Sequence, residues 1–365
     1  MDSTTLGFLT LNLNHENKYV TEIAKRSLHY KIECVRFEPT SISPANLEVK
    51  GEHYDHSAKE WMSSVFSIPP FIYDRCFYQK NQLSQKSKPI VEWLKNYHKT
   101  TFLGQGLPDK WKIHKALQKD SILSCYLPQT ILVKDSVQIQ QQLAAQGACL
   151  LKPINGSKGL GIFAVKLEKK FILLTYHIGR DKQNRKFPSL QEFGDWCQKL
   201  LQQNDYLLQP FLSLQDTQGY PFDIRLLLQK NEEGNWCLRG KGIRKGYYGS
   251  FLSNLNTGGE SLIFEDWFNS LTAHNQVLVN DELKTISDRL PTILEGNFPN
   301  LFELGVDIGF AKDGSLWILD INSKPGRKVI LQTKPNLEDT LYEAPLTYCR
   351  FLKKQSSLKG VEPIE

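Results

Sequence analysis

The sequence predicts a mixed α/β protein that folds as more than one domain. Apolar stretches of strand length alternate with segments of helical pattern along most of the chain. The chain has 365 residues, which exceeds what one hydrophobic core usually organises, so two or three domains are expected. Hydrophobic residues make up 40% and charged residues 23% of the sequence, as in ordinary folded proteins.

Charge, hydropathy and cysteine content exclude several functional classes. The net charge is only +6 and no dense basic run occurs, so nucleic acid is not an expected partner. A few cations focused on a polyphosphate, or a lysine-rich solvated surface, would account for this excess equally well. The longest apolar runs are strand-sized and no signal-peptide pattern opens the chain, so no membrane association is expected. Seven scattered cysteines without a C-x-x-C pair argue against a disulfide framework or a zinc site and favour the cytoplasm.

The first 105 residues are predicted to form a small α/β domain. Strands are expected at residues 6–13, 32–37 and 71–73, with a helix over 20–28, and the segment 40–59 is left unassigned. Residues 103–110 have the composition of a linker. Asp109 then caps a predicted helix over residues 111–117.

Two strand-rich lobes are predicted after the linker. Helices are expected over residues 137–146, after Ser136, and after Ser189, where Glu192 completes a capping box. Strands are expected at 149–152, 161–167, 171–177, 206–211, 222–230, 236–243, 304–312 and 315–321. We therefore divide the chain into an N-terminal domain (1–105), a first lobe (106–212), a second lobe (213–353) and a loose tail (354–365).

A glycine-rich segment is the first candidate site. Lys152 leaves a predicted strand and is followed by the flexible turn N-G-S-K-G-L-G, residues 155–161. Glycines let backbone N–H groups approach phosphate oxygens, and a lysine supplies positive charge. The spacing is not that of a P-loop, and a strand rather than a helix follows. The segment either binds phosphate or is an ordinary glycine-rich hairpin with a surface lysine.

A pair of facing aspartates is the second candidate site. Asp313-Gly314 is a strong signal for a two-residue hairpin turn. With that turn, Asp307 lies opposite Asp320, and Asn322 lies opposite Gly305 on the same face. Two carboxylates and an amide oxygen are ligands that Mg²⁺ prefers. The alternative is that both aspartates point into water and their pairing is incidental.

Basic residues on two further strands form the third candidate site. Asp223 and Arg225 share one strand face in P-F-D-I-R, and Arg239 shares a face with Lys241 in R-G-K-G-I-R-K-G, which also contains Arg244. Arginine suits bidentate contact with phosphate or carboxylate. An ordinary hairpin with surface arginines is the alternative. Neither a G-x-S-x-G motif nor a Cys/His pairing stands out, so a nucleophilic triad is not favoured.

Taken in order, these motifs resemble those of the ATP-grasp superfamily. The order is K-P-x-x-G-S-x-G-x-G-I, then L-L-Q-P-F, D-I-R, S-N-L-x-x-G-G, G-V-D-I and L-D-I-N-S-x-P-G, over roughly residues 105–350. The pattern is most similar to that of YheC/YheD-type proteins of spore-forming bacteria, which are described as spore-coat-associated, and also resembles that of ligases that add glutamate to a ribosomal protein. The resemblance implies an ATP-grasp fold whose two lobes sandwich the nucleotide, preceded by a small α/β pre-ATP-grasp domain.

The resemblance also implies roles for individual residues. Those implied for phosphate, adenine and other nucleotide contacts are Lys110, Lys152, Ser157, Lys158, Gly159, Gln209, Phe211 and Lys241. Those implied near the reacting groups are Arg225, Arg244 and Asn254, and those implied for the metal are Asp307, Asp320 and Asn322. The second metal carboxylate is often glutamate in the superfamily, so the shorter Asp320 departs from the pattern.

The activity implied is an ATP- and Mg²⁺-dependent carboxylate–amine ligase, with Mn²⁺ as an alternative metal. A small-molecule or peptide carboxylate would take the γ-phosphoryl group, and an amine acceptor would then displace phosphate. Two other readings stay open. One is an ATP-grasp kinase for a small molecule, and the other is a non-catalytic nucleotide-binding protein that contacts other spore-coat proteins. A cytoplasmic or spore-coat location is expected accordingly.

Overall fold

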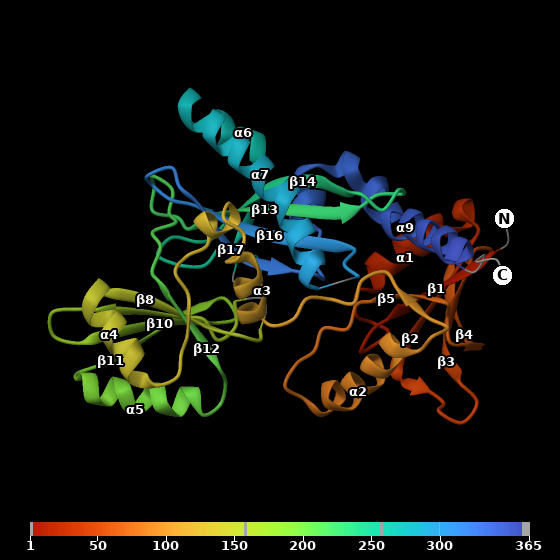
Figure 1. The fold of residues 1–365 in the computed structure, drawn as a ribbon, viewed down its shortest axis with the longest axis horizontal. Helices are drawn as coiled ribbons and strands as arrows, with labels where there is room; N and C mark the ends of the chain where they lie inside the picture. Colours follow the sequence, from red (N-terminus) through yellow and green to blue (C-terminus); the bar gives the residue numbers. More distant parts are fainter. Residues whose placement is uncertain (1–2, 157–158, 254, 256–257, 299, 360–365) are drawn as a thin grey trace, which may run out of the picture.

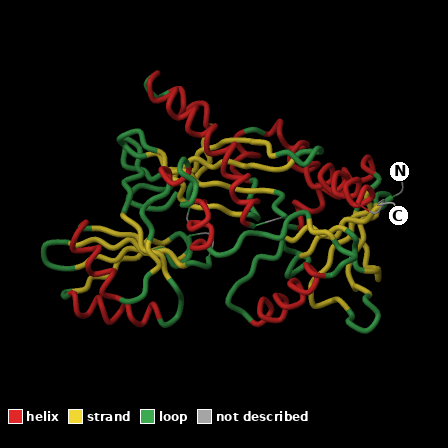
Figure 2. Tube along the Cα trace, viewed as in Figure 1, coloured by secondary structure: helices red, strands yellow, loops and turns green. Residues whose placement is uncertain are grey.

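The computed structural model describes residues 3–156, 159–253, 255, 258–298 and 300–359. Its strands form three separate sheets, which Figures 1 and 2 show as three strand-rich regions joined by loops and flanked by helices. The mixed α/β class predicted from the sequence is therefore confirmed. Among the described residues, no helix has both the length and the apolar character needed to cross a bilayer.

The N-terminal domain is built on a sheet of strand order β4-β3-β2-β1-β5-β6. Strands β1, β2 and β5 are parallel neighbours, and β2-β3-β4 form an antiparallel meander. The segment 40–59, which the sequence pattern left unassigned, contains the end of β2 and all of β3. The elements are β1 (Thr4–Leu9), α1 (Asn17–Arg26), η1 (Ser27–Tyr30), β2 (Ile32–Ile42), β3 (Glu48–Asp55), β4 (Glu60–Ser67), β5 (Phe71–Asp74), α2 (Gln82–Asn96) and β6 (Thr101–Phe102).

The first lobe has a sheet of order β11-β10-β9-β8-β12-β7. Helices α4 and α5 pack on one of its faces, through a core that includes Leu143, Leu151, Phe193 and Leu208. The elements are α3 (Lys110–Leu117), η2 (Leu123–Tyr126), β7 (Ile131–Leu132), α4 (Ser136–Gln146), β8 (Ala148–Pro153), β9 (Phe163–Leu167), β10 (Ile172–Ile178), β11 (Asp181–Phe187), α5 (Leu190–Leu201) and β12 (Tyr206–Pro210).

The second lobe has an antiparallel sheet of order β15-β14-β13-β16-β17. Its strands alternate, so Ile224 and Leu226 face a core formed with α7 while Asp223 and Arg225 face the other side. The elements are β13 (Phe222–Lys230), β14 (Trp236–Lys245), β15 (Glu260–Ile263), α6 (Phe264–Asn269), α7 (Ala273–Asn297), β16 (Glu303–Phe310), β17 (Leu316–Asn322), α8 (Lys328–Thr333), η4 (Pro335–Leu337) and α9 (Glu338–Lys359).

The last helix returns to the N-terminal domain. In Figure 1, α9 lies beside α1. Tyr342 and Leu346 of α9 enter the same hydrophobic core as Leu6 and Ile23. The loose tail predicted from residue 354 is wrong at its start, because α9 continues to Lys359.

The hairpin of β16 and β17 contains two irregularities that offset each other. The predicted two-residue turn is wrong, since Ala311 rather than Lys312 pairs with Ser315 and Gly314 adopts a φ of 89°. This longer turn shifts the register by one residue. A bulge at Leu319 then restores it, because Ile308 faces Ile318 while Asp307 faces Asp320. Ile318 and Ile321 of β17 face the core.

Candidate functional site

The two aspartates and the asparagine lie on the face of the β13–β17 sheet that is opposite its helical core. Asp307 is directly across from Asp320, as predicted, and Asn322 is across from Gly305. The side-chain amide of Asn322 donates to Asp320 Oδ2 over 3.4 Å. Asp307 is 5% exposed, whereas the Asp320 side chain is about a quarter exposed. The three oxygen-bearing side chains therefore share one partly open sheet face.

Gly305 has no side chain to fill the space beside Asn322, and other groups occupy it. A methyl group added at Gly305 would meet Arg225 Nη1 at 2.6 Å and Pro325 Cβ at 2.7 Å. The missing side chain therefore lets the Arg225 guanidinium lie flat beside the aspartates. Glycine is needed at this position because of this close approach and not because of its backbone conformation, since the φ of Gly305 is not positive.

Two arginines surround Asp307. Arg225 Nη1 is 2.8 Å from Asp307 Oδ1, and Arg244 Nη2 is 2.8 Å from Oδ2. Arg244 also makes a bidentate pair with Asp223, with both distances at 2.7 Å. Asp223 in turn accepts a hydrogen bond from Ser253. The aspartate of D-I-R thus orients Arg244, which lies directly across from it on β14, a role that sequence reasoning did not assign.

Two lysines of the first lobe contact the strand that carries Asp320. Lys110 is the first residue of α3, which Asp109 caps through Lys112 N, and its ammonium is hydrogen-bonded to Asp320. Lys152 on β8 donates to the carbonyl of Leu319 over 3.4 Å, which is the carbonyl of the bulged residue. The bulge therefore both restores the register and offers an acceptor to Lys152.

Burial and ion pairing shift the pKa values of the two aspartates in opposite directions. Burial raises the pKa of Asp307, although Arg225 and Arg244 oppose it. Burial also acts to raise the pKa of Asp320, but Lys110 and Lys152 outweigh it and hold this pKa below its ordinary value. The pKa of Lys152 falls to about 8 because burial penalises its charged form more than Asp320 favours it.

The donor set fits a hard divalent cation together with an anionic ligand. Within the described ranges, no group of three or more His, Cys, Asp or Glu side chains is placed to hold a metal. The set here is instead two carboxylates and the amide oxygen of Asn322, which suits Mg²⁺ or Mn²⁺ sharing its coordination with phosphate. Asp307 Oδ1 and Arg225 Nη1 are both buried without a hydrogen-bond partner despite their ion pair. These atoms retain bonding capacity for a ligand.

Three other predicted residues lie on β12, directly after it, or in the turn after β8. Gln209 faces Leu150 across the β8–β12 ladder, so its side chain is on the Lys152 face of that sheet, where it donates to Thr130 Oγ1 over 2.8 Å. Phe211 directly follows β12 and is 41% exposed. Gly159 has a φ of 78°, which suits a glycine in the turn after Lys152.

The structure separates Lys241 from the other predicted residues. Lys241 pairs with Leu226 across the β13–β14 ladder and therefore lies on the opposite face from Arg225 and Arg244. Its ammonium is 4.4 Å from the centre of the Phe264 ring. We therefore leave it out of the candidate site. Ser157, Lys158 and Asn254 lie outside the described residues.

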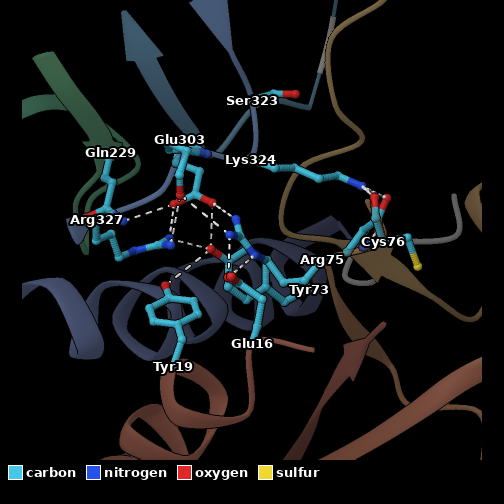
Figure 3. A network of polar contacts seen from close by, with 12 residues as sticks. Glu16, Tyr19, Tyr73, Arg75, Cys76, Gln229, Glu303, Ser323, Lys324 and Arg327 are labelled. Carbon is cyan, nitrogen blue, oxygen red and sulfur yellow. Dashed lines mark hydrogen bonds and ion pairs between the residues drawn. The ribbon is translucent and has the colours of Figure 1, made fainter. Parts of the chain in front are cut away.

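A buried network centred on Glu303 was not foreseen from the sequence. Glu303 lies on the same face of β16 as Asp307 and contacts Arg75, Tyr73, Gln229 and Arg327 (Figure 3). Arg75 and Glu303 are 228 positions apart. Pairings over such a separation have no local sequence signal.

Comparison with known proteins places these features in a family. The model of YheC/D-like ATP-grasp proteins matches residues 99–352. The endospore coat-associated protein YheC of Bacillus subtilis is 47% identical over 361 residues, covering 99% of both chains. The endospore coat-associated protein YheD of the same organism is 24% identical and covers 76% of this chain and 61% of its own.

Solved structures show the same fold at low sequence identity. D-alanyl-alanine synthetase A of Vibrio cholerae superposes with a TM-score of 0.53 at 11% identity, covering 94% of this chain and 98% of its own. A RiPP-associated ATP-grasp ligase of Chryseobacterium gregarium, in complex with ADP and a leader and core peptide, gives 0.52 at 10% identity and covers 97% of both. The chain has the ATP-grasp fold and belongs to the YheC/D-like ATP-grasp family.

Proposed function

We propose that this protein is an ATP- and Mg²⁺-dependent carboxylate–amine ligase that acts through an acylphosphate. The observation that supports this most strongly is a cluster of four cations around two facing aspartates, three of them paired with the carboxylates and the fourth, Lys152, bonded to the carbonyl next to Asp320. Lys110 and Lys152 come from the first lobe, and Arg225 and Arg244 come from the second. Such a cluster suits the charge of a nucleoside triphosphate bound between the lobes.

Each group has a proposed role in holding the nucleotide and its metal. Asp307, Asp320 and Asn322 would hold Mg²⁺ or Mn²⁺, which when bound neutralises charge on the transferring phosphoryl group. Lys152 and Lys110 would bind phosphate oxygens, and Gln209 and Phe211 would meet the adenine. The Lys110 ammonium is hydrogen-bonded to Asp320 in this structure. It would therefore have to move from this carboxylate to the phosphates when a metal binds to Asp320. Its flexible stem permits that exchange.

The arginines would act on the reacting end. Arg225 and Arg244 are held by Asp307 and Asp223, so their guanidinium groups are oriented before any substrate arrives. They would stabilise charge on the phosphoryl group as the substrate carboxylate attacks it and ADP leaves. An amine would then attack the acylphosphate carbon, form the amide bond and release phosphate.

Product analysis distinguishes this function from its alternatives. The protein is incubated with Mg-ATP and a panel of amino acids and peptides, with hydroxylamine as the trapping amine. The ligase predicts ADP together with a hydroxamate. ADP with a stable phosphorylated product would instead support a small-molecule kinase, and AMP as the main nucleotide product would contradict phosphoryl transfer at the terminal position. Mg-ATP binding without turnover on any acid would favour a non-catalytic nucleotide-binding protein.

We further propose a spore-coat location, with other coat proteins as partners. The support is the identity of 47% over nearly the whole chain to a protein described as endospore coat-associated. Immunoblotting of coat extracts and of the decoated spores from the source organism tests this. Recovery in the coat extract is expected, and recovery confined to the decoated spores would contradict it.

A further inference from the structure

The segment after Asn322 is held by side chains rather than by regular structure. Residues 323–327 join the end of β17 to α8 without helix or strand. Their position therefore depends on side-chain contacts, and these also determine where the last residue of β17 points. That residue is Asn322, the proposed third ligand of the metal.

The N-terminal domain and its linker supply several of these contacts. The Lys324 ammonium is 2.7 Å from Asp74 Oδ2 and 2.9 Å from the carbonyl of Cys76. Ser323 Oγ accepts from the backbone N–H of Leu107 in the linker over 2.9 Å. Figure 3 shows Lys324 reaching toward Cys76 beside the central network.

Arg75 connects this segment to the body of both domains. Its side chain is fully buried, and its Nη2 donates to the Pro325 carbonyl over 3.5 Å and to Glu16 over 2.6 Å. Its Nη1 donates to Glu303 over 2.8 Å. One guanidinium thus ties the N-terminal domain, strand β16 and the loop after Asn322 together (Figure 3).

Through Arg327, the same network also connects to Asp307, one of the proposed metal ligands. Arg327 pairs with Glu303 and also donates to the Pro325 carbonyl over 3.1 Å. Pro325 packs over Gly305, where the Arg225 guanidinium also lies. Arg225 is in turn paired with Asp307. A continuous set of contacts therefore runs from Arg75 to both strands that carry the proposed metal ligands.

Stability alone is a weak explanation for this cluster. Removing charges from water is costly, and buried ion pairs are often no more stabilising than apolar groups of similar shape. What the pairs provide is a fixed geometry, since planar guanidinium groups define the positions of their partners. Side chains that orient ligands in this way commonly affect metal affinity by about tenfold to a hundredfold.

We propose that Arg75 is a positioning residue of the metal site, and that the N-terminal domain thereby forms part of the ATP-binding unit. The inference rests on the proposed function for the metal and the nucleotide. Arg75 acts through the Pro325 carbonyl and Glu303 on residues 323–327, and through them on Asn322. It touches neither ATP nor metal.

The test compares ATP binding with and without metal in two matched variants. Calorimetry gives the Kd of ATP in excess Mg²⁺ and in EDTA for wild type, Arg75→Met and Arg36→Met. Arg36 is also a buried arginine of the N-terminal domain, 2.5 Å from Glu52, and it bonds to Leu13 and Asn17 of the same domain. Arg75→Met should reduce the Mg²⁺-dependent gain in affinity by about tenfold or more, with the Kd in EDTA within about twofold of wild type. Arg36→Met should leave both values unchanged.

Further variants separate positioning from folding. Arg75→Lys keeps the charge and should recover part of the Mg²⁺-dependent gain. If Arg75→Met does not fold, Ser323→Ala, which removes only the contact with Leu107, should weaken the gain in the same selective way. A folded Arg75→Met protein with the wild-type gain, or an equal loss in Mg²⁺ and in EDTA, would overturn the inference. A wild-type protein with no Mg²⁺-dependent ATP binding would instead contradict the proposed function.

Discussion

Lys152 carries a charge that is costly to bury in the free protein and that would be stabilised by a bound phosphate. Its ammonium is partly buried beside Lys110, and its protein partner within hydrogen-bond distance is a backbone carbonyl at 3.4 Å. This environment lowers its pKa to about 8 because the charge is poorly solvated. A phosphate bound nearby would supply the missing counter-charge. Lys152 is therefore poised to gain more from an anionic ligand than a surface lysine would.

The affinity for Mg-ATP is predicted to fall as the pH rises above about 8. Only protonated Lys152 pairs with phosphate, so bound ATP raises the pKa of Lys152. The affinity is then full below the free-protein pKa of about 8 and is lost above it. A decrease of about tenfold is expected between pH 7 and about pH 9. Calorimetry across this range measures it.

Two lysine variants sharpen this prediction. Lys152→Arg keeps its charge at all these pH values and should flatten the profile. Lys152→Ala should weaken binding about tenfold to a hundredfold at pH 7. Lys241→Ala, on the opposite sheet face, serves as the matched control and should leave the affinity unchanged. A profile for Lys152→Ala that matched the wild type would remove Lys152 from the nucleotide site.

At the scale of elements, the β16–β17 hairpin depends on the absence of a side chain at Gly305. Gly305→Ala is predicted to lower the free energy of unfolding by about 1–3 kcal/mol, because the new methyl group overlaps Arg225 and Pro325. It should also weaken Mg-ATP binding, since Arg225 must move away from Asp307. Urea denaturation measures the first effect and calorimetry the second.

Gly296→Ala controls for the effect of replacing glycine by alanine where no close packing is disturbed. Gly296 lies in α7, and a methyl group there would meet no atom within 4 Å beyond the adjoining part of its own helix. This change should stabilise the protein by about 0.4–1 kcal/mol and leave nucleotide binding unchanged. Equal stability changes in the two variants would contradict the close packing described at Gly305.

The same hairpin shows how far the sequence could predict this site. The alternation of Asp307, Asp320 and Asn322 with apolar residues identified the functional face, because a half-buried strand has a period of two. The facing of Asp307 and Asp320 was predicted correctly from a turn that was wrong by one residue, and only the bulge at Leu319 preserved it. A bulge has no reliable sequence signal. The pairing of the aspartates was therefore predicted correctly although the turn was not.

Other features could not be predicted from local pattern. Lys241 and Arg244 differ by an odd number of positions and so lie on opposite faces of β14, but without its register neither face could be assigned to the site. Helices α2, α7 and α9 each contain a proline, at Pro89, Pro291 and Pro345, and proline argues against a helix interior. These helices are stabilised by tertiary packing, which local propensity does not reveal.

At the scale of the whole molecule, the N-terminal domain is not an independent unit. Its core includes Tyr342, Leu346 and Cys349 of α9, which follows the second lobe in the chain. Phe302, which precedes β16, stacks on Tyr348 in the same core at a centroid distance of 4.9 Å. The boundary near residue 105 therefore separates segments of the chain but does not separate hydrophobic cores.

Leu346→Ala is predicted to destabilise the N-terminal domain together with α9. Leu346 is fully buried, so its truncation should cost about 2–5 kcal/mol. Hydrogen exchange should show reduced protection in β1 and α1 as well as in α9. Leu358→Ala on the same helix, where the side chain is 61% exposed, should change stability by less than about 0.5 kcal/mol. Unchanged protection in β1 of the Leu346 variant would show that the domain folds separately.

The central claim is that the two facing aspartates couple a divalent metal to ATP. Its most direct test is a calorimetric titration of ATP, in Mg²⁺ and in EDTA, into the wild type, Asp320→Ala and Asp313→Ala, with Asp313 an exposed aspartate in the turn of the same hairpin. We predict that the wild type and Asp313→Ala bind ATP more tightly in Mg²⁺ than in EDTA. Asp320→Ala should lose this difference but still bind ATP in EDTA, because Lys110 is freed to contact the phosphates. A folded Asp320→Ala protein with the wild-type response to Mg²⁺ would contradict the claim.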